Sequence, residues 1–304
     1  MLRAPLLTFV LLAWPLATQA QTQASCTFNV FPLKTTIKLS DGSSVFLQPL
    51  GIDDFSTIVG YGSSGTGGLI RWANGGVTHV GGTAELIARN DHGTDVGFDS
   101  KFRGVLVNGP TITPIVLDVN NTGVVPSGIN NSGTVVGYYK EYVGGNHGFK
   151  RFNNGTTHTL DFPGEVRGTT KPAGINDLGA VVGTYRDTNG HLHGFIFHNG
   201  QWATLDYPQA SDTVPVGITN GGQVIGNAYF LNGPRTLFLY ENGTFKVISV
   251  PNSTAGSPIL MSVSPKQELI LGRKTTGTTA GPDSLPSVSK LTKGGQLRSL
   301  YITH

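Results

Sequence analysis

The feature that most constrains the fold is a phrase that recurs along the chain. Residues 174–183 repeat residues 128–137 almost residue for residue, in the pattern Gly-Ile-Asn-(Asn/Asp)-x-Gly-x-Val-Val-Gly. Weaker copies begin at residues 51, 88, 217 and 262, and the glycines that close the copies are Gly60, Gly97, Gly137, Gly183, Gly226 and Gly272. Successive closing glycines are 37–46 residues apart, a spacing that is typical of β-propeller blades.

A second phrase follows each copy and predicts a hairpin. Residues 147–149 and 193–195 both read His-Gly-Phe, and each leads through an Asn-Gly pair into Thr-Leu-Asp-(Phe/Tyr)-Pro. Asn-Gly between two β-type runs is typical of a type I′ hairpin turn, because both central residues need positive φ. The Asn-Gly pairs stand at 74–75, 108–109, 154–155, 199–200 and 242–243, and Lys293-Gly294-Gly295 takes this place in the last copy.

Each repeat therefore reads as four antiparallel strands, a to d. In the fourth copy, these strands are expected near residues 173–175, 180–185, 193–197 and 201–207. Tight turns join a to b and c to d, whereas longer connections join b to c and d to the next a. One such sheet cannot bury both of its faces, so neighbouring repeats must pack on each other. The predicted fold is all-β: a β-propeller of six blades, each with four antiparallel strands.

The blade count has one alternative, which depends on residues 26–48. Residues 27–32 resemble a strand d and could add an outer strand to the C-terminal blade, so that they act as a ring-closing latch. Alternatively, residues 26–48, with an extra hairpin at Asp41-Gly42, form a degenerate seventh blade. The segment from Leu47 to Gly51 is short for a crossing from an outer strand to the next inner one, which needs at least about four or five extended residues. This favours six blades.

The N-terminal residues predict export. Residues 1–20 combine Arg3, an apolar run and a small-residue cleavage site, which is the pattern of a signal peptide. Residues 21–304 are then expected to be a single secreted domain, extracellular or periplasmic, with no later apolar run of the roughly 18 residues that a membrane span needs. Cys26 is the only cysteine, which excludes an internal disulfide. Its surroundings fit a lipidation site poorly, so a free thiol is expected.

Charge and spacing argue against several kinds of site. The formal net charge of +3 is small and the Lys and Arg residues are scattered, so no nucleic-acid partner is expected. His147 and His193 occupy equivalent places in neighbouring repeats, and Asp187 begins a glycine turn, but neither arrangement has a full ligand set in sequence. Asp161 and Asp206 recur once per repeat, which favours a structural role over a glycosidase pair. No catalytic residue, metal or cofactor is predicted.

The two phrases resemble those of the HAF-type extracellular repeat family, named for a His-Ala-Phe tripeptide. Residues 147–149 and 193–195 have Gly in place of the Ala, and the Gly-Ile-Asn and Leu-Asp-(Phe/Tyr)-Pro phrases accompany them. The match is strong over residues 127–208 and weaker on either side, where Gly68, Arg103 and Thr236 replace the His. The resemblance implies export and a propeller-like repeat, and it implies no established activity.

The two kinds of connection predict where a binding site lies. In a propeller, the b–c and d–a connections share one face and the tight turns share the other. The long connections carry aromatic and cationic side chains, which suit stacking on and hydrogen bonding to sugars or peptides. Packing of the tyrosines between blades is the alternative. The expected binding residues are Tyr139, Tyr142, Tyr185, Arg186 and Arg235.

These observations predict a monomeric, exported, non-catalytic β-propeller that binds a ligand or partner on its long-loop face. The expected partner is a glycan, a cell-envelope component or another protein. The alternative is a polysaccharide hydrolase or lyase, because the fold alone does not separate binding from catalysis. An unrepeated acidic or His cluster on the long-loop face would favour an enzyme. Asp91, His92, Asp95 and Asp99 come nearest, but Asp91 and His92 fall in an a–b turn, on the opposite face.

Overall fold

The computed structural model describes residues 25–27, 29–32, 36–38, 44–63, 67–117, 119–142, 144–249, 258–264, 269–273 and 289–292. The predicted signal peptide, residues 1–20, lies outside them. Within these ranges every regular element is a β-strand, which confirms the all-β prediction. The same residues contain no helix that is long and apolar enough to cross a membrane.

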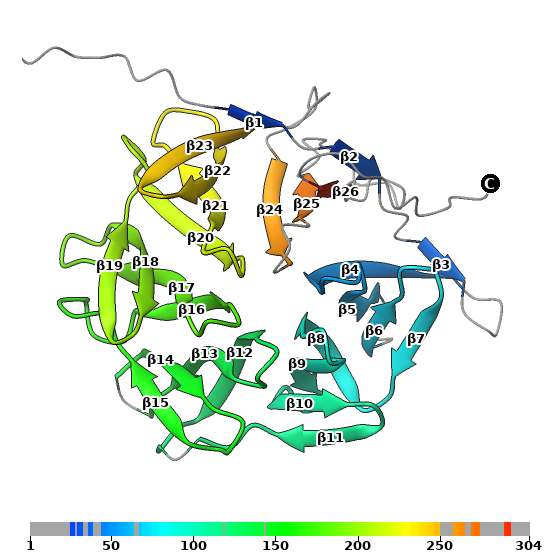
Figure 1. The fold of residues 1–304 in the computed structure, drawn as a ribbon. Helices are drawn as coiled ribbons and strands as arrows, with labels where there is room; N and C mark the ends of the chain where they lie inside the picture. The colour runs from blue at the N-terminus through cyan, green and yellow to red at the C-terminus, as the bar shows by residue number, and fades with distance from the viewer. Residues whose placement is uncertain are drawn as a thin grey trace, which may run out of the picture.

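The strands form successive antiparallel sheets of four strands around a common axis (Figure 1). The first two sheets are β4 (Ser44–Ile52), β5 (Ile58–Gly62), β6 (Gly67–Arg71) and β7 (Val77–Val80), then β8 (Thr83–Arg89), β9 (Thr94–Asp99), β10 (Gly104–Asn108) and β11 (Thr111–Pro114). The next two are β12 (Gly123–Ile129), β13 (Val135–Lys140), β14 (Asn146–Arg151) and β15 (Thr157–Leu160), then β16 (Lys171–Ile175), β17 (Val181–Arg186), β18 (Leu192–His198) and β19 (Gln201–Leu205). Then follow β20 (Asp212–Ile218), β21 (Val224–Tyr229), β22 (Thr236–Glu241) and β23 (Thr244–Ser249), and finally β24 (Pro258–Val263), β25 (Leu269–Arg273) and β26 (Ser289–Thr292).

The first strand of each sheet lies nearest the axis, and later strands lie progressively closer to the rim (Figure 1). This arrangement is a β-propeller, as predicted, and each sheet is named below by its inner strand. The count of six blades stays a prediction.

Three short N-terminal strands join three different sheets. β2 (Asn29–Pro32) pairs antiparallel with β26 and so supplies the outer strand of the β24 sheet. β1 (Ser25–Thr27) pairs parallel with β23, and β3 (Thr36–Lys38) pairs antiparallel with the start of β4. The described parts of residues 26–48 thus extend existing sheets. The pairing of β2 is the one that the latch alternative requires.

The closing glycine of each of the first five repeats faces a β-bulge in the inner strand. Between Pro126 and Gly128 the pairing of β12 with β13 shifts its register, and β16 and β17 show the same shift beside Gly183. A Cβ atom on Gly137 would overlap the carbonyl oxygen of Val125. The glycine that spaces the repeats in sequence therefore marks a close approach of two backbones, where no side chain fits.

The hydrophobic core lies between neighbouring sheets. Phe149 and Phe195, which end the two His-Gly-Phe phrases, are fully buried, as is Phe238 in the β20 sheet. Phe149 belongs to a cluster that also contains Val96 of the preceding β8 sheet. Burial of a phenylalanine contributes about 1.5–3 kcal/mol, so these residues hold adjacent sheets together.

The Asn of the recurring phrase also links the β8, β12, β16 and β20 sheets in turn. The side-chain amide of Asn90 donates a hydrogen bond to the carbonyl of Asn130 (3.1 Å), Asn130 donates to Asn176 (3.0 Å), and Asn176 donates to Thr219 (2.9 Å). The side-chain oxygen of Asn130 accepts the N–H of Thr134 in its own turn. We call this chain of contacts the asparagine relay, and it explains why the phrase recurs.

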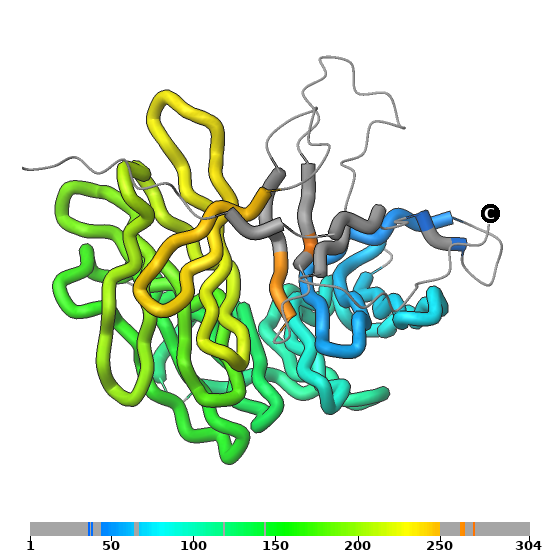
Figure 2. The backbone as a smooth tube through the Cα atoms, turned by 45° about the horizontal axis from the view of Figure 1, so that its top comes forward, coloured from blue at the N-terminus to red at the C-terminus, as the bar shows by residue number. Residues whose placement is uncertain are grey.

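The connections gather on opposite ends of the ring. The β13–β14 and β15–β16 connections touch each other, since the N–H of Asn146 donates to the carbonyl of Gly168 (2.9 Å). The long-loop face includes residues 140–142, 144–146, 161–170, 186–192, 206–212 and 229–236; the short-turn face carries the a–b and c–d turns. The yellow connection between β21 and β22 projects beyond the strands (Figure 2).

Candidate binding sites on the long-loop face

Two of the predicted binding residues are buried. Tyr139 is 4% exposed and Tyr185 is 7% exposed. The ring of Tyr185 stacks on Phe162 with centroids 3.6 Å apart, and its hydroxyl lies 2.9 Å from the hydroxyl of Thr204. The expectation that Tyr139 and Tyr185 offer an exposed platform is therefore wrong, because both fill the space where strand b ends. Packing of these tyrosines, the alternative, is what the structure shows.

The other three predicted residues are accessible but lie apart. Tyr142 is 92% exposed in the β13–β14 connection. Arg186 is exposed in the β17–β18 connection, and its guanidinium donates to the carbonyl of Gly190 (2.7 Å). Arg235 lies in the β21–β22 connection with its guanidinium 5.5 Å from the ring centre of Tyr229. These residues come from three sheets and form no common cluster.

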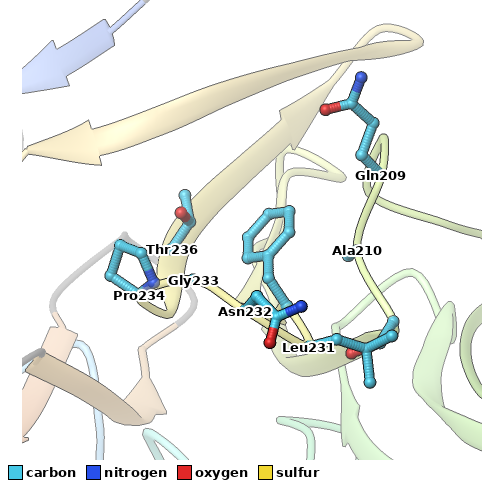
Figure 3. A pocket seen from close by; sticks show the side chains of 9 residues that line it. Gln209, Ala210, Leu231, Asn232, Gly233, Pro234 and Thr236 are labelled. Atoms are coloured by element: carbon cyan, nitrogen blue, oxygen red, sulfur yellow. The ribbon is translucent and has the colours of Figure 1, made fainter.

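A pocket of about 550 Å³ opens on the long-loop face (Figure 3). It lies between the β19–β20 connection and the β21–β22 connection. Its lining residues are Gln209, Ala210, Ser211, Phe230, Leu231, Asn232, Gly233, Pro234 and Thr236. Gln209 and Asn232 come from the two facing connections (Figure 3), so the pocket has amide groups on both sides.

The floor of this pocket is aromatic and its rim is neutral. Phe230 meets the buried ring of Tyr207 edge to face, with centroids 6.0 Å apart, and Tyr207 in turn contacts Phe238. Leu231 is 89% exposed at the rim. None of the lining residues is an acid or a base. Such a surface offers apolar contact and neutral hydrogen-bonding groups, which suits an uncharged polar ligand.

The recurring His and Asp form side-chain pairs. His147 Nδ1 lies 2.8 Å from Asp161 Oδ2, and His193 Nδ1 lies 2.8 Å from Asp206 Oδ1. In both repeats, the Asp that follows strand d reaches the imidazole ring. The contacts hold strand c to strand d at the long-loop face.

The β17–β18 connection gathers a further group of ionisable side chains. Asp187, His191 and His193 place one ligand-type atom each within 4.8 Å of the others. Burial alone raises the pKa of Asp187, but hydrogen bonds from the backbone N–H groups of His191 and Asn189, together with the nearby His193 ring and the Asn189 amide, outweigh it and lower this pKa to about 2. Burial lowers the pKa of His193, but Asp206 and Asp187 outweigh it and raise this pKa. His191 was not predicted from the sequence, although His191 and His193 form a His-x-His pattern that could have indicated a ligand pair.

A second pocket, of about 530 Å³, lies on the short-turn face. It contains Phe55, Trp72, Asp91 and His92, and the guanidinium of Arg89 lies 5.1 Å from the ring centre of Trp72. Asp91 and His92 therefore lie in an a–b turn, as predicted. Their main contacts are with the next sheet: Asp91 N–H donates to Asn131, and His92 Nδ1 lies 2.9 Å from the Asn131 carbonyl.

At the axis of the ring, the described parts of the inner strands line a cavity of about 230 Å³. Gly128, Gly174 and Gly217 bring these strands together, because a Cβ on Gly128 would lie 3.3 Å from the Cα of Gly174 and one on Gly174 would lie 3.2 Å from the Cα of Gly217. The two larger pockets described above lie off the axis.

Comparisons with known proteins show the fold alone. The chain matches no protein-family model and no curated protein. Among solved structures, it is similar to a catalytically inactive variant of virginiamycin B lyase from Staphylococcus aureus with quinupristin, at 13% identity, a TM-score of 0.53, and coverage of 87% of this chain and 99% of that chain. A streptogramin B lyase gives 14% identity, a TM-score of 0.50 and coverage of 88% and 98%. TolB from Acinetobacter baumannii is similar at 14% identity with a TM-score of 0.51, and the match covers 80% of this chain and 65% of that chain.

Proposed function

We propose that this protein is an exported, non-catalytic β-propeller that binds an uncharged saccharide unit in the pocket between the β19–β20 and β21–β22 connections. Export rests on the signal-peptide pattern of residues 1–20. The binding site rests on one observation: the pocket on the long-loop face has an aromatic floor and a rim of amide and hydroxyl groups. Aromatic faces pack against sugar rings, while amides and hydroxyls bond sugar hydroxyl groups.

The composition of the pocket supports binding over catalysis. Glycoside hydrolysis uses two carboxyl groups that flank the scissile bond, and no residue that lines this pocket carries one. A volume of about 550 Å³ lies within the range of about 300–1,000 Å³ that is typical of small-ligand pockets. Arg235, which the sequence predicts as a binding residue, lies between the lining residues Pro234 and Thr236 in the chain.

The test is a glycan and polysaccharide array with the mature protein, followed by titration of the best ligand. Leu231→Ala and Asn232→Ala alter the rim without touching the core. Each is expected to weaken binding at least about fivefold, because truncation of one anchor typically costs more than about 1 kcal/mol. Leu178→Ala is the matched control, because Leu178 is an exposed leucine on the short-turn face; it should bind like the parent.

Three results would overturn the proposal. Equal affinities of the parent, Leu231→Ala and Asn232→Ala would place the ligand elsewhere. If the same residues bind a protein or another envelope component and no saccharide, the ligand is not a saccharide and the proposal is wrong. Cleavage of a polysaccharide on the array, measured as new reducing ends or unsaturated products, would identify an enzyme.

A further inference from the structure

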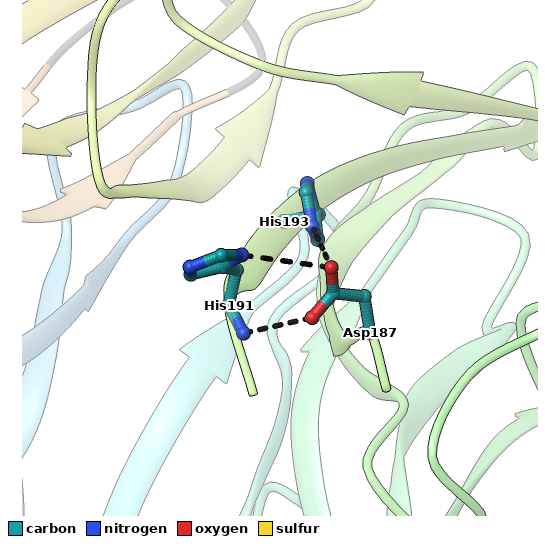
Figure 4. Close-up of side chains that lie close together, drawn as sticks. All are labelled: Asp187, His191 and His193. Atoms are coloured by element: carbon teal, nitrogen blue, oxygen red, sulfur yellow. Dashed lines mark hydrogen bonds and ion pairs between the residues drawn. The ribbon is translucent and has the colours of Figure 1, made fainter. Parts of the chain in front are cut away.

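The β17–β18 connection places three metal-ligating side chains around one point (Figure 4). Asp187 Oδ2 lies 3.6 Å from His191 Nδ1 and 3.5 Å from His193 Nε2. These separations are longer than ordinary hydrogen bonds. They match the edge of a tetrahedron whose centre lies about 2.1 Å from each ligand, since that edge is about 3.4 Å for zinc-type distances.

Local structure directs the Asp187 carboxylate toward the two rings. Asp187 Oδ1 accepts the backbone N–H groups of Asn189 and His191, both at 2.9 Å, so the turn fixes this side chain. Its other oxygen, Oδ2, faces both imidazole rings and has one further contact, Asn189 Nδ2 at 3.3 Å. One carboxylate oxygen therefore lies between two histidine nitrogens.

His193 is held in the orientation that a metal ligand needs. Its Nδ1 pairs with Asp206 at 2.8 Å, which leaves Nε2 to face Asp187. A metal-bound histidine usually donates the N–H of its second ring nitrogen to a carboxylate, a backbone carbonyl or water. This hydrogen bond sets the tautomer and raises the basicity of the ligand. The ring also stacks on the buried Tyr185, with centroids 5.2 Å apart.

The β12 sheet lacks the same group. His147 and Asp161 keep the His–Asp pair, and Glu141 lies 3.4 Å from His147 Nε2. However, Gly145 stands where the β16 sheet has His191, and Arg167 binds the Glu141 carboxylate at 3.1 Å. The β17–β18 connection thus differs from the equivalent connection of the β12 sheet in two ways: it has a second histidine, and no arginine among the described residues occupies its carboxylate.

We infer that Asp187, His191 and His193 bind a first-row transition-metal dication of the Zn²⁺ class. Two imidazoles and one carboxylate suit such ions, whereas Ca²⁺ and Mg²⁺ need sets of oxygen ligands. Three protein ligands leave a fourth position open to water or to an external ligand. Because the side chain of His191 is 64% exposed, that position opens to the solvent on the long-loop face.

The test is calorimetric titration of the mature protein, free of any histidine tag, with ZnCl₂. One Zn²⁺ per chain is expected, and Co²⁺ in its place should give the visible spectrum of a nitrogen- and oxygen-bound ion. His191→Ala and Asp187→Asn should each weaken Zn²⁺ binding at least about tenfold, in line with the losses that ligand-shell mutations cause. His79→Ala, which removes an exposed histidine of β7, should bind like the parent.

Two outcomes would overturn the inference. The first is Zn²⁺ binding to His191→Ala and Asp187→Asn with the stoichiometry and affinity of the parent, which would mean adventitious binding elsewhere. The second is a parent that binds Zn²⁺ no more tightly than Ca²⁺. His191 and Asp187 lie at the surface, so circular dichroism and the melting midpoint without metal will show whether the variants are folded. Saccharide binding, measured separately with Leu231→Ala, does not depend on this result.

Discussion

At the scale of single residues, Arg89 and Asp95 form an ion pair where other sheets have hydrocarbon side chains. Arg89 lies opposite Asp95 across β8 and β9, whereas Ile129 lies opposite Val135 across β12 and β13. The guanidinium bonds both oxygens of Asp95, at 2.9 and 2.8 Å, and lies 3.5 Å from Asp53. Two buried carboxylates thus share one cation. Burial raises the pKa of Asp95 to about 6, and the attraction of Arg89 offsets this only in part.

This pair predicts a distinct dependence of stability on pH. The pKa of Asp95 in the folded protein is above its ordinary value of 3.8, so between about pH 4 and 6 the folded state binds more protons than the unfolded state. The free energy of unfolding must then fall as pH rises through this window. The contribution of Asp95 is on the order of 3 kcal/mol, at about 1.4 kcal/mol per pKa unit.

Asp95→Asn removes the carboxyl group that titrates and leaves one side-chain oxygen at position 95 to accept from Arg89. Chemical denaturation at pH 4, 5, 6 and 7 should show a smaller decline of stability with pH in Asp95→Asn than in the parent. Because Asp53 and Glu85 also have raised pKa values, the comparison of slopes, and not the parent curve alone, isolates Asp95. Parallel curves for the two proteins would show that Asp95 is ionised throughout.

At the scale of the elements, the recurring phrase combines a turn with a contact to the next sheet. Asn176 is 1% exposed; its side-chain oxygen accepts the N–H of Ala180 and its amide donates to the carbonyl of Thr219, both at 2.9 Å. A buried polar group that loses its partner costs about 1–3 kcal/mol. Each member of the asparagine relay therefore stabilises its own hairpin and the interface with its neighbour.

Asn176→Ala should lower the free energy of unfolding by about 2–4 kcal/mol, since it leaves one buried donor and one buried acceptor unpaired. Asn154→Ala is the control, because the Asn154 side chain accepts only the exposed N–H of Thr156 in a c–d turn; its loss should be below about 1 kcal/mol. Urea denaturation measures both. Similar losses in the two variants would mean that the relay adds nothing beyond the turn.

Turn chemistry made the strands of one repeat predictable. The strands expected near residues 180–185 and 193–197 correspond to β17 (Val181–Arg186) and β18 (Leu192–His198). Side-chain direction was harder to predict, because a tyrosine that ends a strand can face solvent or a neighbouring sheet. Tyr185 packs against Phe162, which lies in the connection between β15 of the preceding sheet and β16. The cluster around His191 escaped prediction because Asp187 is brought to it by a turn.

At the scale of the whole molecule, the ring joins segments from opposite ends of the sequence. Asn29 pairs with Thr292 and Pro32 pairs with Ser289, so the outer strand of the β24 sheet comes from the N-terminal region. A strand pattern in sequence does not show which strand it pairs with, so the pattern of residues 27–32 alone does not distinguish a latch from an extra blade. The pocket between the β19–β20 and β21–β22 connections depends instead on the packing of sheets that are adjacent in sequence.

Removal of residues 25–32 is the direct test of closure, since it deletes β1 and β2 and leaves β4 intact. A deletion of 26–48 would also remove the buried Val45 and Leu47 of β4 and so would confuse latch with core. Without β2, β26 presents an unpaired edge, and such edges promote aggregation.

The lost pairing is worth about 2–5 kcal/mol at about 1 kcal/mol per hydrogen bond, which lowers the melting midpoint by about 5–10 °C in a domain of this size. Calorimetry and size-exclusion chromatography measure both effects, with a Gly/Ser replacement of residues 25–32 as the control for chain length. A deletion variant that melts with the parent and elutes as a monomer would show that the ring closes without this strand.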